Sequence, residues 1–166
     1  MGCRIGFRRQ LVLSWLLGPA LAQPPDNTLN QRAASVVNNY WEIWSSDNAS
    51  ALGYVDQVYA GHVLFYGEAI SHQALLKKKW DFAQQWPARR YSTEPDKLSI
   101  SCKPAAATYD VSGVVHWDAK SPERGVESSG DADFAFTLAL RADKGLIQAD
   151  SGSGIGRAQR ASRSRT

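Results

Sequence analysis

The sequence has few cysteines and no long apolar run, and each scarcity limits what the protein can be. Of the two cysteines in 166 residues, only Cys102 follows the expected leader, so the sequence does not predict a domain held together by disulfides. The longest apolar stretch, LVLSWLLGPALA, has about a dozen residues, whereas a membrane-spanning helix needs roughly 20. We therefore expect a domain stabilised by an apolar core and no stable membrane insertion after processing.

That apolar stretch has the plan of a secretory signal peptide. Three arginines and no acid precede it, and it ends in the small-x-small pattern Ala20-Leu21-Ala22. We predict that residues 1–22 form a signal peptide cleaved after Ala22, and that the mature protein is periplasmic or secreted. A retained N-terminal anchor is the alternative.

Excess basic charge is absent from the body of the chain. The net charge of +3 arises from 19 basic and 16 acidic residues, but residues 23–156 hold 12 basic and 16 acidic side chains. The remaining arginines lie in the leader and in the last ten residues, RAQRASRSRT, which we predict to be a disordered Arg/Ser tail over 157–166. The alkaline isoelectric point therefore does not indicate a nucleic-acid-binding protein, and we expect no nucleic-acid partner.

Residues 23–156 suffice for one domain, and their pattern predicts helices followed by strands. Apolar residues at helical spacing predict one helix from Asn27 or Thr28 to Trp44, a second ending at Gly61, and a third from Ser71 to Pro87. A strand is expected over 62–67, followed by a turn at 68–70. Four strand-like runs over 89–104, 108–121, 125–142 and 145–152 complete an α+β fold, in which we expect a curved antiparallel sheet wrapped on three helices.

The order of these elements resembles that of the nuclear transport factor 2-like superfamily, a cone-shaped α+β fold shared with ketosteroid isomerase. The resemblance is carried by YVDQVYAGHVLFYGEAISHQALLKKKWDFAQQWPARRY, and above all by YG, WP and RRY within it. The same motifs are similar to an exported bacterial subgroup that is sometimes fused to caspase-like domains. One departure stands out: the last strand, GLIQADSG, lacks a tryptophan and has Asp150 where that subgroup has glutamate. The resemblance implies the fold, but fold alone assigns no activity.

A cavity inside the cone is the functional feature that this resemblance implies. His62 and Tyr66 would supply its polar atoms if their strand parity, shared with Leu64, faces inward. The aromatic candidates for its wall are Tyr54, Tyr59, Trp80 and Trp86. Packing in an ordinary core is the competing interpretation for each of these residues.

Motifs for catalysis or for metal binding are scarce. His116 and Asp118 share one face of a strand, but Val111, Val115 and Trp117 occupy the other face, so we expect the histidine in solvent and predict no metal site. DSGSGIG is neither a nucleophile elbow nor a phosphate loop, and we expect no cofactor.

Lys77, Lys78 and Lys79 turn about 100° each around their helix, so they are not one basic face. Lys79 falls on the apolar stripe, where we expect its ammonium group to reach water.

We therefore favour a non-catalytic binding or interaction module with a pocket for a small molecule or peptide. A pocket enzyme of isomerase or lyase type is the first alternative, and a structural or assembly subunit is the second. A homodimer could form through the open sheet face, where we place a row of small and mixed side chains: Asp110, Ser112, Val114, Asp133, Ala135, Thr137 and Ala139.

Overall fold

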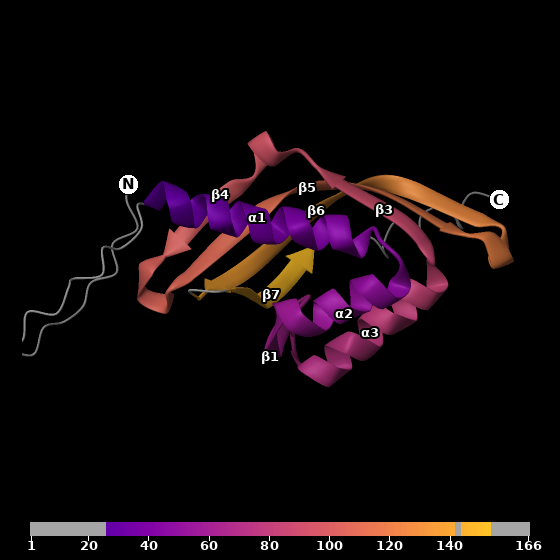
Figure 1. Cartoon of the computed structure of the whole chain (residues 1–166), viewed down its shortest axis with the longest axis horizontal. Helices are drawn as coiled ribbons and strands as arrows, with labels where there is room; N and C mark the ends of the chain where they lie inside the picture. Colours follow the sequence, from indigo (N-terminus) through magenta and orange to yellow (C-terminus); the bar gives the residue numbers. More distant parts are fainter. Residues whose placement is uncertain (1–25, 142–143, 154–166) are drawn as a thin grey trace, which may run out of the picture.

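The computed structural model describes residues 26–141 and 144–153 (Figure 1). Its helices are α1 (Asp26–Trp44), α2 (Asn48–Val58) and α3 (His72–Gln85). Its strands are β1 (Tyr59–Phe65), β2 (Glu68–Ser71), β3 (Ala88–Thr93), β4 (Ser99–Lys103), β5 (Thr108–Ser121), β6 (Val126–Leu140) and β7 (Gly145–Gly152). The predicted signal peptide and Arg/Ser tail lie outside the described residues.

One sheet contains all these strands, in the order β2-β1-β7-β6-β5-β3, with β4 also paired to β5. The α+β class with three helices and an open, curved sheet is therefore confirmed. The sheet is not wholly antiparallel, however, because β7 pairs parallel to β1 and antiparallel to β6. This pairing places β7 beside β1, which brings Asp150 of β7 close to Tyr59 of β1.

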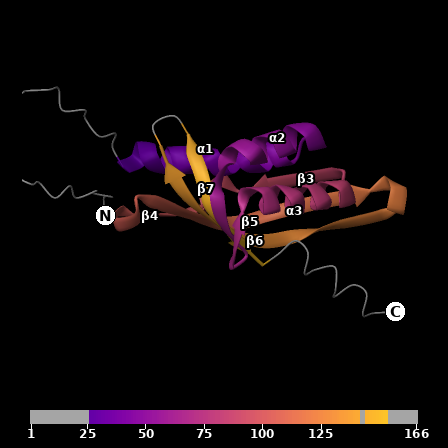
Figure 2. The same cartoon turned by 90° about the horizontal axis from the view of Figure 1, so that it is seen from below.

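The three helices cover one face of the sheet, and the core lies between the two layers (Figure 2). Val37 and Tyr40 of α1 are buried against the sheet residues Phe136 and Leu138, as their helical and strand periodicities predict. Tyr40 contacts the Phe136 ring edge-on, with the ring centroids 5.1 Å apart. The long β5–β6 hairpin runs on past the helices at one end of the sheet (Figure 1).

Local signals account for the boundaries of α3. The Ser71 side chain accepts a hydrogen bond from the backbone nitrogen of Ala74 at 3.2 Å, so Ser71 is the N-cap that the sequence predicted. The helix ends at Gln85, two residues before Pro87.

Within the described ranges, no helix is both long enough and apolar enough to cross a bilayer.

Three segments differ from the sequence prediction. The second helix ends at Val58 rather than at Gly61, because the backbone is already extended at Tyr59, where β1 begins. Residues 68–71 form strand β2 rather than a turn, because the two-residue loop Tyr66-Gly67 reverses the chain directly after β1. Both loop residues have positive φ, 50° and 85°, as a type I′ hairpin turn requires. The run over 89–104 is two strands instead of one, because a 3₁₀ turn at Pro95–Lys97 interrupts it and proline cannot donate to a strand ladder.

Candidate functional site

Four polar side chains meet inside the fold and form what we call the polar cluster: Tyr40 of α1, Tyr59 of β1, Lys79 of α3 and Asp150 of β7. The Tyr59 hydroxyl donates a hydrogen bond to Asp150 Oδ2 at 2.5 Å, and Lys79 Nζ donates to the same oxygen at 3.1 Å. Lys79 also donates to the Tyr40 hydroxyl at 2.8 Å, and the two phenol oxygens lie 3.2 Å apart. The cluster thus ties α1 and α3 to the sheet.

A β-bulge places Asp150 in this cluster. Leu138 of β6 pairs with Ile147, but the preceding Thr137 pairs with Ala149, so Gln148 is an extra residue on β7. A bulge reverses the alternation of side chains beyond it. Ile147 and Asp150 are therefore both buried, although they are three residues apart.

Lys79 enters the cluster from the buried face of α3. It lies one turn after Leu75 and one turn before Ala83, both of which are fully buried. Its ammonium nitrogen is 5.2 Å from the ring centroid of Phe65 and 5.5 Å from that of Trp44, within cation–π range. The prediction that this ammonium group reaches water was wrong, because the Asp150 carboxylate and the rings around it hold it inside.

The hydrogen bonds of the cluster have one self-consistent direction. A phenol has a single proton, so if Tyr59 donates to Asp150, the bond between the two phenols must be donated by Tyr40. Tyr40 in turn accepts from Lys79. Only Tyr59 and Lys79 donate directly to the Asp150 carboxylate, and Tyr40 is linked to it through the Tyr59 hydroxyl.

The electrostatics keep Lys79 and the two phenols of the cluster in one protonation state near neutral pH. Burial alone would lower the pKa of Lys79, but the Asp150 carboxylate and the Tyr40 phenol outweigh it and raise that pKa above its usual value. Burial raises the pKa of both phenols, that of Tyr59 well above its usual value. Lys79 therefore stays an ammonium ion and the phenols stay neutral donors, so none of these three groups is a ready base.

Tyr66 lies at the border of the cluster. It follows β1 in the left-handed region, with φ of 50°, which is uncommon for a bulky side chain. This turn brings its ring against that of the preceding Phe65, edge-on with centroids 4.8 Å apart, where an extended chain would send the two rings to opposite faces. Burial, assisted by the nearby Asp150 carboxylate, raises the pKa of its phenol to about 12, although 49% of the residue is exposed.

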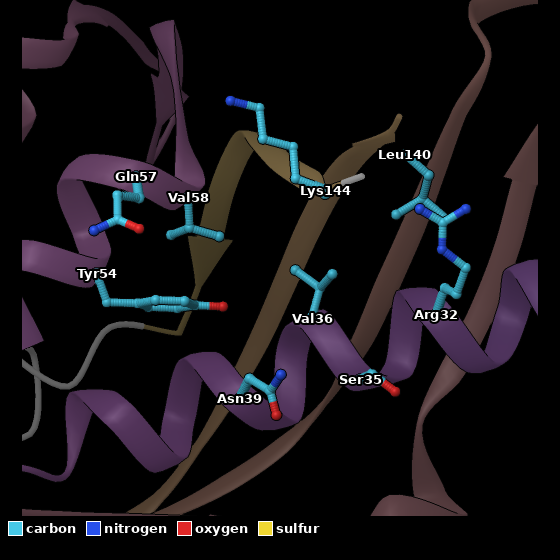
Figure 3. Close-up of a pocket in the computed structure, with 10 residues that line it drawn as sticks. Arg32, Ser35, Val36, Asn39, Tyr54, Gln57, Val58, Leu140 and Lys144 are labelled. Carbon is cyan, nitrogen blue, oxygen red and sulfur yellow. The ribbon is translucent and has the colours of Figure 1, made fainter. Parts of the chain in front are cut away.

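A separate hollow on the surface, the α1–α2 pocket, has a volume of about 360 Å³. It lies between α1, α2 and the adjoining ends of β6 and β7 (Figure 3). Its lining residues are Arg32, Ser35, Val36, Asn39, Tyr54, Gln57, Val58, Leu140, Lys144 and Gly145.

The α1–α2 pocket combines an apolar floor with a cationic rim. Val36, Val58 and Leu140 supply the apolar surface, and no acidic side chain is among the lining residues described above. Arg32 is fixed at one end by a hydrogen bond that it donates to the carbonyl oxygen of Arg141, and Lys144 also borders the pocket (Figure 3). Tyr54 extends along the pocket from α2, and burial raises the pKa of its phenol. Such a lining suits a small molecule with an apolar body and an anionic group.

Comparison with known proteins settles the fold. Neither protein-family models nor curated proteins match the sequence. Among solved structures, a nuclear transport factor 2-like superfamily protein from Salmonella enterica serovar Typhimurium superposes with a TM-score of 0.63 at 11% identity, over 78% of this chain and 96% of that one. This chain has the nuclear transport factor 2-like fold.

Other proteins with this fold are equally remote in sequence. Aln2 from a Streptomyces species is 10% identical over 84% of this chain and 99% of that one, with a TM-score of 0.63. A protein from Novosphingobium aromaticivorans, provisionally assigned as a scytalone dehydratase, is 6% identical over 76% of this chain and 83% of that one, also at 0.63. The superpositions establish the nuclear transport factor 2-like fold. Because the sequence identities are so low, the activity has to be argued from the site.

The structure does not gather the six predicted pocket residues into one site. His62 is exposed on β1, where Val63 and not its neighbours faces inward, so the condition that the face shared by His62 and Leu64 points into the cavity is not met. Tyr59 belongs to the polar cluster, and Tyr66 borders it. Trp86 is buried in the core, whereas 52% of Trp80 is exposed on α3. Tyr54 lines the α1–α2 pocket instead of the cone interior.

Metal binding finds no support among the described residues, which contain no group of three or more potential ligands. His116 is exposed as predicted, and its Nδ1 lies 2.9 Å from Asp131 Oδ1 across the β5–β6 pair. His72 is held between the Ala60 carbonyl oxygen and Asp56, which fixes the start of α3 against α2.

Sequence reasoning missed Lys79 and Asp150 as a pair. The available signal was a cation in the middle of an apolar helical stripe, because a buried cation needs an opposite charge. The identity of that charge could not be read from the last strand, since simple alternation puts Asp150 on the opposite face from Ile147.

Proposed function

We propose that this protein is a small-molecule-binding module whose α1–α2 pocket takes a ligand with an apolar body and a carboxylate or similar anionic group. The observation that carries the proposal is the lining of that pocket. Arg32 and Lys144 stand at its border, apolar side chains form its floor, and no acid is among its described lining residues.

The dimensions of the pocket favour a small molecule over a peptide. Ligand pockets usually have volumes of roughly 300–1,000 Å³, and this one, at about 360 Å³, lies near the lower end. Ser35, Asn39 and Gln57 add hydrogen-bonding groups along the walls. Figure 3 shows Tyr54 and Gln57 of α2 opposite Val36 and Asn39 of α1, so a ligand would lie between the two helices.

Isothermal titration calorimetry with matched ligands tests the proposal. We expect 4-phenylbutyrate and octanoate to bind, and the corresponding alcohols to bind at least about tenfold more weakly, a difference of about 1.4 kcal/mol. The expected effect of Lys144→Glu is to abolish the preference for the acid, because it reverses the charge at the border. Lys77→Glu, an equal change on the exposed side of α3, is the matched control and should leave binding unchanged. Equal affinity for acids and alcohols, or no binding of either acid, would contradict the proposal.

A pocket enzyme of isomerase or lyase type is the second candidate, and one contact favours it. Asp150 lies 2.5 Å from the Tyr59 phenol, which is the pairing of a buried carboxylate with a donor that such chemistry uses. The same carboxylate oxygen also accepts from Lys79, which stays charged, so it is not a free base. Mass spectrometry of ligand recovered after incubation separates the two candidates: unchanged ligand supports binding alone, and a dehydrated or isomerised product supports the enzyme.

A further inference from the structure

Three buried residues, which we call the donor group, hold polar atoms that lack a hydrogen-bond partner. They are Trp41 of α1 with Nε1, Arg89 of β3 with Nε and Nη2, and Tyr91 of β3 with its hydroxyl. The indole of Trp44 acts on the Tyr91 oxygen as a donor, so it is the phenol proton that lacks an acceptor. Each residue is more than nine-tenths buried, with exposures of 7%, 6% and 5%. Leaving one such group unpaired costs roughly 1–3 kcal/mol, and more when the group is charged.

These residues are neighbours in space. Arg89 and Tyr91 are alternate residues of β3, so both side chains point into the core. The rings of Trp41 and Tyr91 are in contact, with centroids 5.2 Å apart. The Arg89 guanidinium lies over the ring of Trp44, one helical turn after Trp41, at 4.4 Å. The unpaired atoms therefore belong to one region beneath β3.

The hydrogen bonds of Arg89 involve only one of its three side-chain nitrogens, Nη1. Its Nη1 donates to Asn48 Oδ1 at 2.6 Å and to the Trp86 carbonyl oxygen at 3.1 Å, and both acceptors are uncharged. None of the salt bridges found within the described part of the chain involves Arg89. Asp47, the carboxylate that acts on it electrostatically, is exposed and caps α2. Burial accordingly lowers the pKa of Arg89, although a guanidinium remains charged.

The two unpaired nitrogens of Arg89 identify the chemistry of the missing partner. Nε and Nη2 form the side edge of the guanidinium, whose two parallel N–H bonds match the two oxygens of a carboxylate. Trp41 Nε1 is a donor only, and the Tyr91 hydroxyl can donate as well. A water molecule would satisfy some of these atoms but would not neutralise the charge.

We propose that the donor group is a second, internal site that binds a small carboxylate, held in bidentate fashion by Arg89 with Trp41 and Tyr91 as further donors. This site is separate from the α1–α2 pocket and does not depend on the proposed function.

Thermal unfolding with acetate, and with acetamide as its uncharged isostere, tests this proposal at constant ionic strength. Acetate is expected to raise the melting temperature of the wild-type protein in a saturable manner, and acetamide is not. Arg89→Lys keeps the charge but loses the bidentate edge, so the acetate Kd should rise at least about tenfold. Tyr91→Phe keeps the core volume, removes one donor and should raise the Kd a few-fold.

Lys144→Glu is the control for the α1–α2 pocket and should leave the acetate effect intact. If Arg89→Lys does not fold, Tyr91→Phe and Trp41→Phe carry the test through their reduced response to acetate. A wild-type melting temperature that does not respond to acetate, or an equal response to acetamide, would overturn the proposal. An unchanged acetate Kd in Tyr91→Phe and Trp41→Phe together would also overturn it.

Discussion

At the scale of single residues, Lys79 and Asp150 show how burial changes the role of a charge. Their side chains are 12% and 6% exposed, and each balances the charge of the other inside the core. Lys77, two residues before Lys79, forms an ion pair with Asp81 in solvent, with side-chain exposures of 75% and 58%. We therefore expect Lys77 and Lys79, two residues apart in the sequence, to contribute very different amounts to the free energy of unfolding.

Substitution of Lys79 by methionine tests this contrast. Lys79→Met leaves Asp150 charged and buried without its partner, so we expect the free energy of unfolding to fall by about 3–5 kcal/mol. The double variant Lys79→Met/Asp150→Asn removes both charges and should recover much of that loss. Urea denaturation followed by circular dichroism measures both effects.

Lys77→Met is the matched control for this experiment. It breaks an exposed pair on the same helix and should change the free energy of unfolding by less than about 0.5 kcal/mol. A Lys79→Met variant as stable as Lys77→Met would show that the buried pair contributes nothing measurable.

At the scale of elements, the start of β7 is fixed by its close approach to α1. A Cβ atom added at Gly145 would lie 2.6 Å from Val36 Cγ2, well inside van der Waals contact. Glycine is therefore needed here for space. This contact sets where β7 begins, and the bulge at Gln148 then sets which of its side chains face inward.

Gly145→Ala should accordingly destabilise the protein by about 1–3 kcal/mol, the usual cost of overpacking. Val36→Ala removes the clashing methyl groups, so the double variant should lose less stability than the sum of the two single variants. Gly53→Ala in α2, where nothing lies within 4 Å of the added atom, should instead stabilise by about 0.5–1 kcal/mol. Thermal unfolding of the four variants measures these effects, and strict additivity would rule out the contact as the cause.

At the scale of the whole molecule, five phenols have raised pKa values. These are Tyr40, Tyr54, Tyr59, Tyr66 and Tyr91, and burial is the largest cause in each case. A raised pKa in the folded state means that the native protein keeps protons that the unfolded chain has lost above pH ~10. The associated stability is complete below that pH and is lost as the pH rises through the folded values. Lys79, whose pKa is also raised, contributes in the same direction.

We therefore expect alkaline unfolding with coupled ionisation of tyrosines. Absorbance of phenolate at about 295 nm should rise together with the loss of circular dichroism, above the usual phenol pKa of about 10. Tyr66→Phe removes the phenol whose pKa is about 12, so the decline of stability with pH should become shallower. Tyrosines that titrate near pH ~10 while the fold remains intact would contradict this expectation.

The local pattern of the sequence was enough to determine the fold class and most of the core. Val37 and Tyr40 stand at helical spacing, Val111, Phe136 and Leu138 stand at strand alternation, and Ser71 marks the start of α3. These features follow from the next few residues along the chain, which the sequence displays directly. The α1–α2 pocket was not predicted, because its lining comes from three separate segments; Tyr54 had been expected in the wall of the cone cavity instead.

What only the tertiary structure decided was which polar residues meet inside. Asp150 faces the core because Gln148 is an extra residue in the pairing of β7 with β6, and a bulge cannot be seen by simple alternation. Tyr66 turns back onto Phe65 because the hairpin loop requires positive φ, which reverses the expected parity. Lys79 is buried because Asp150 balances its charge, and a charge that is 71 residues away in the chain acts only after the sheet has formed.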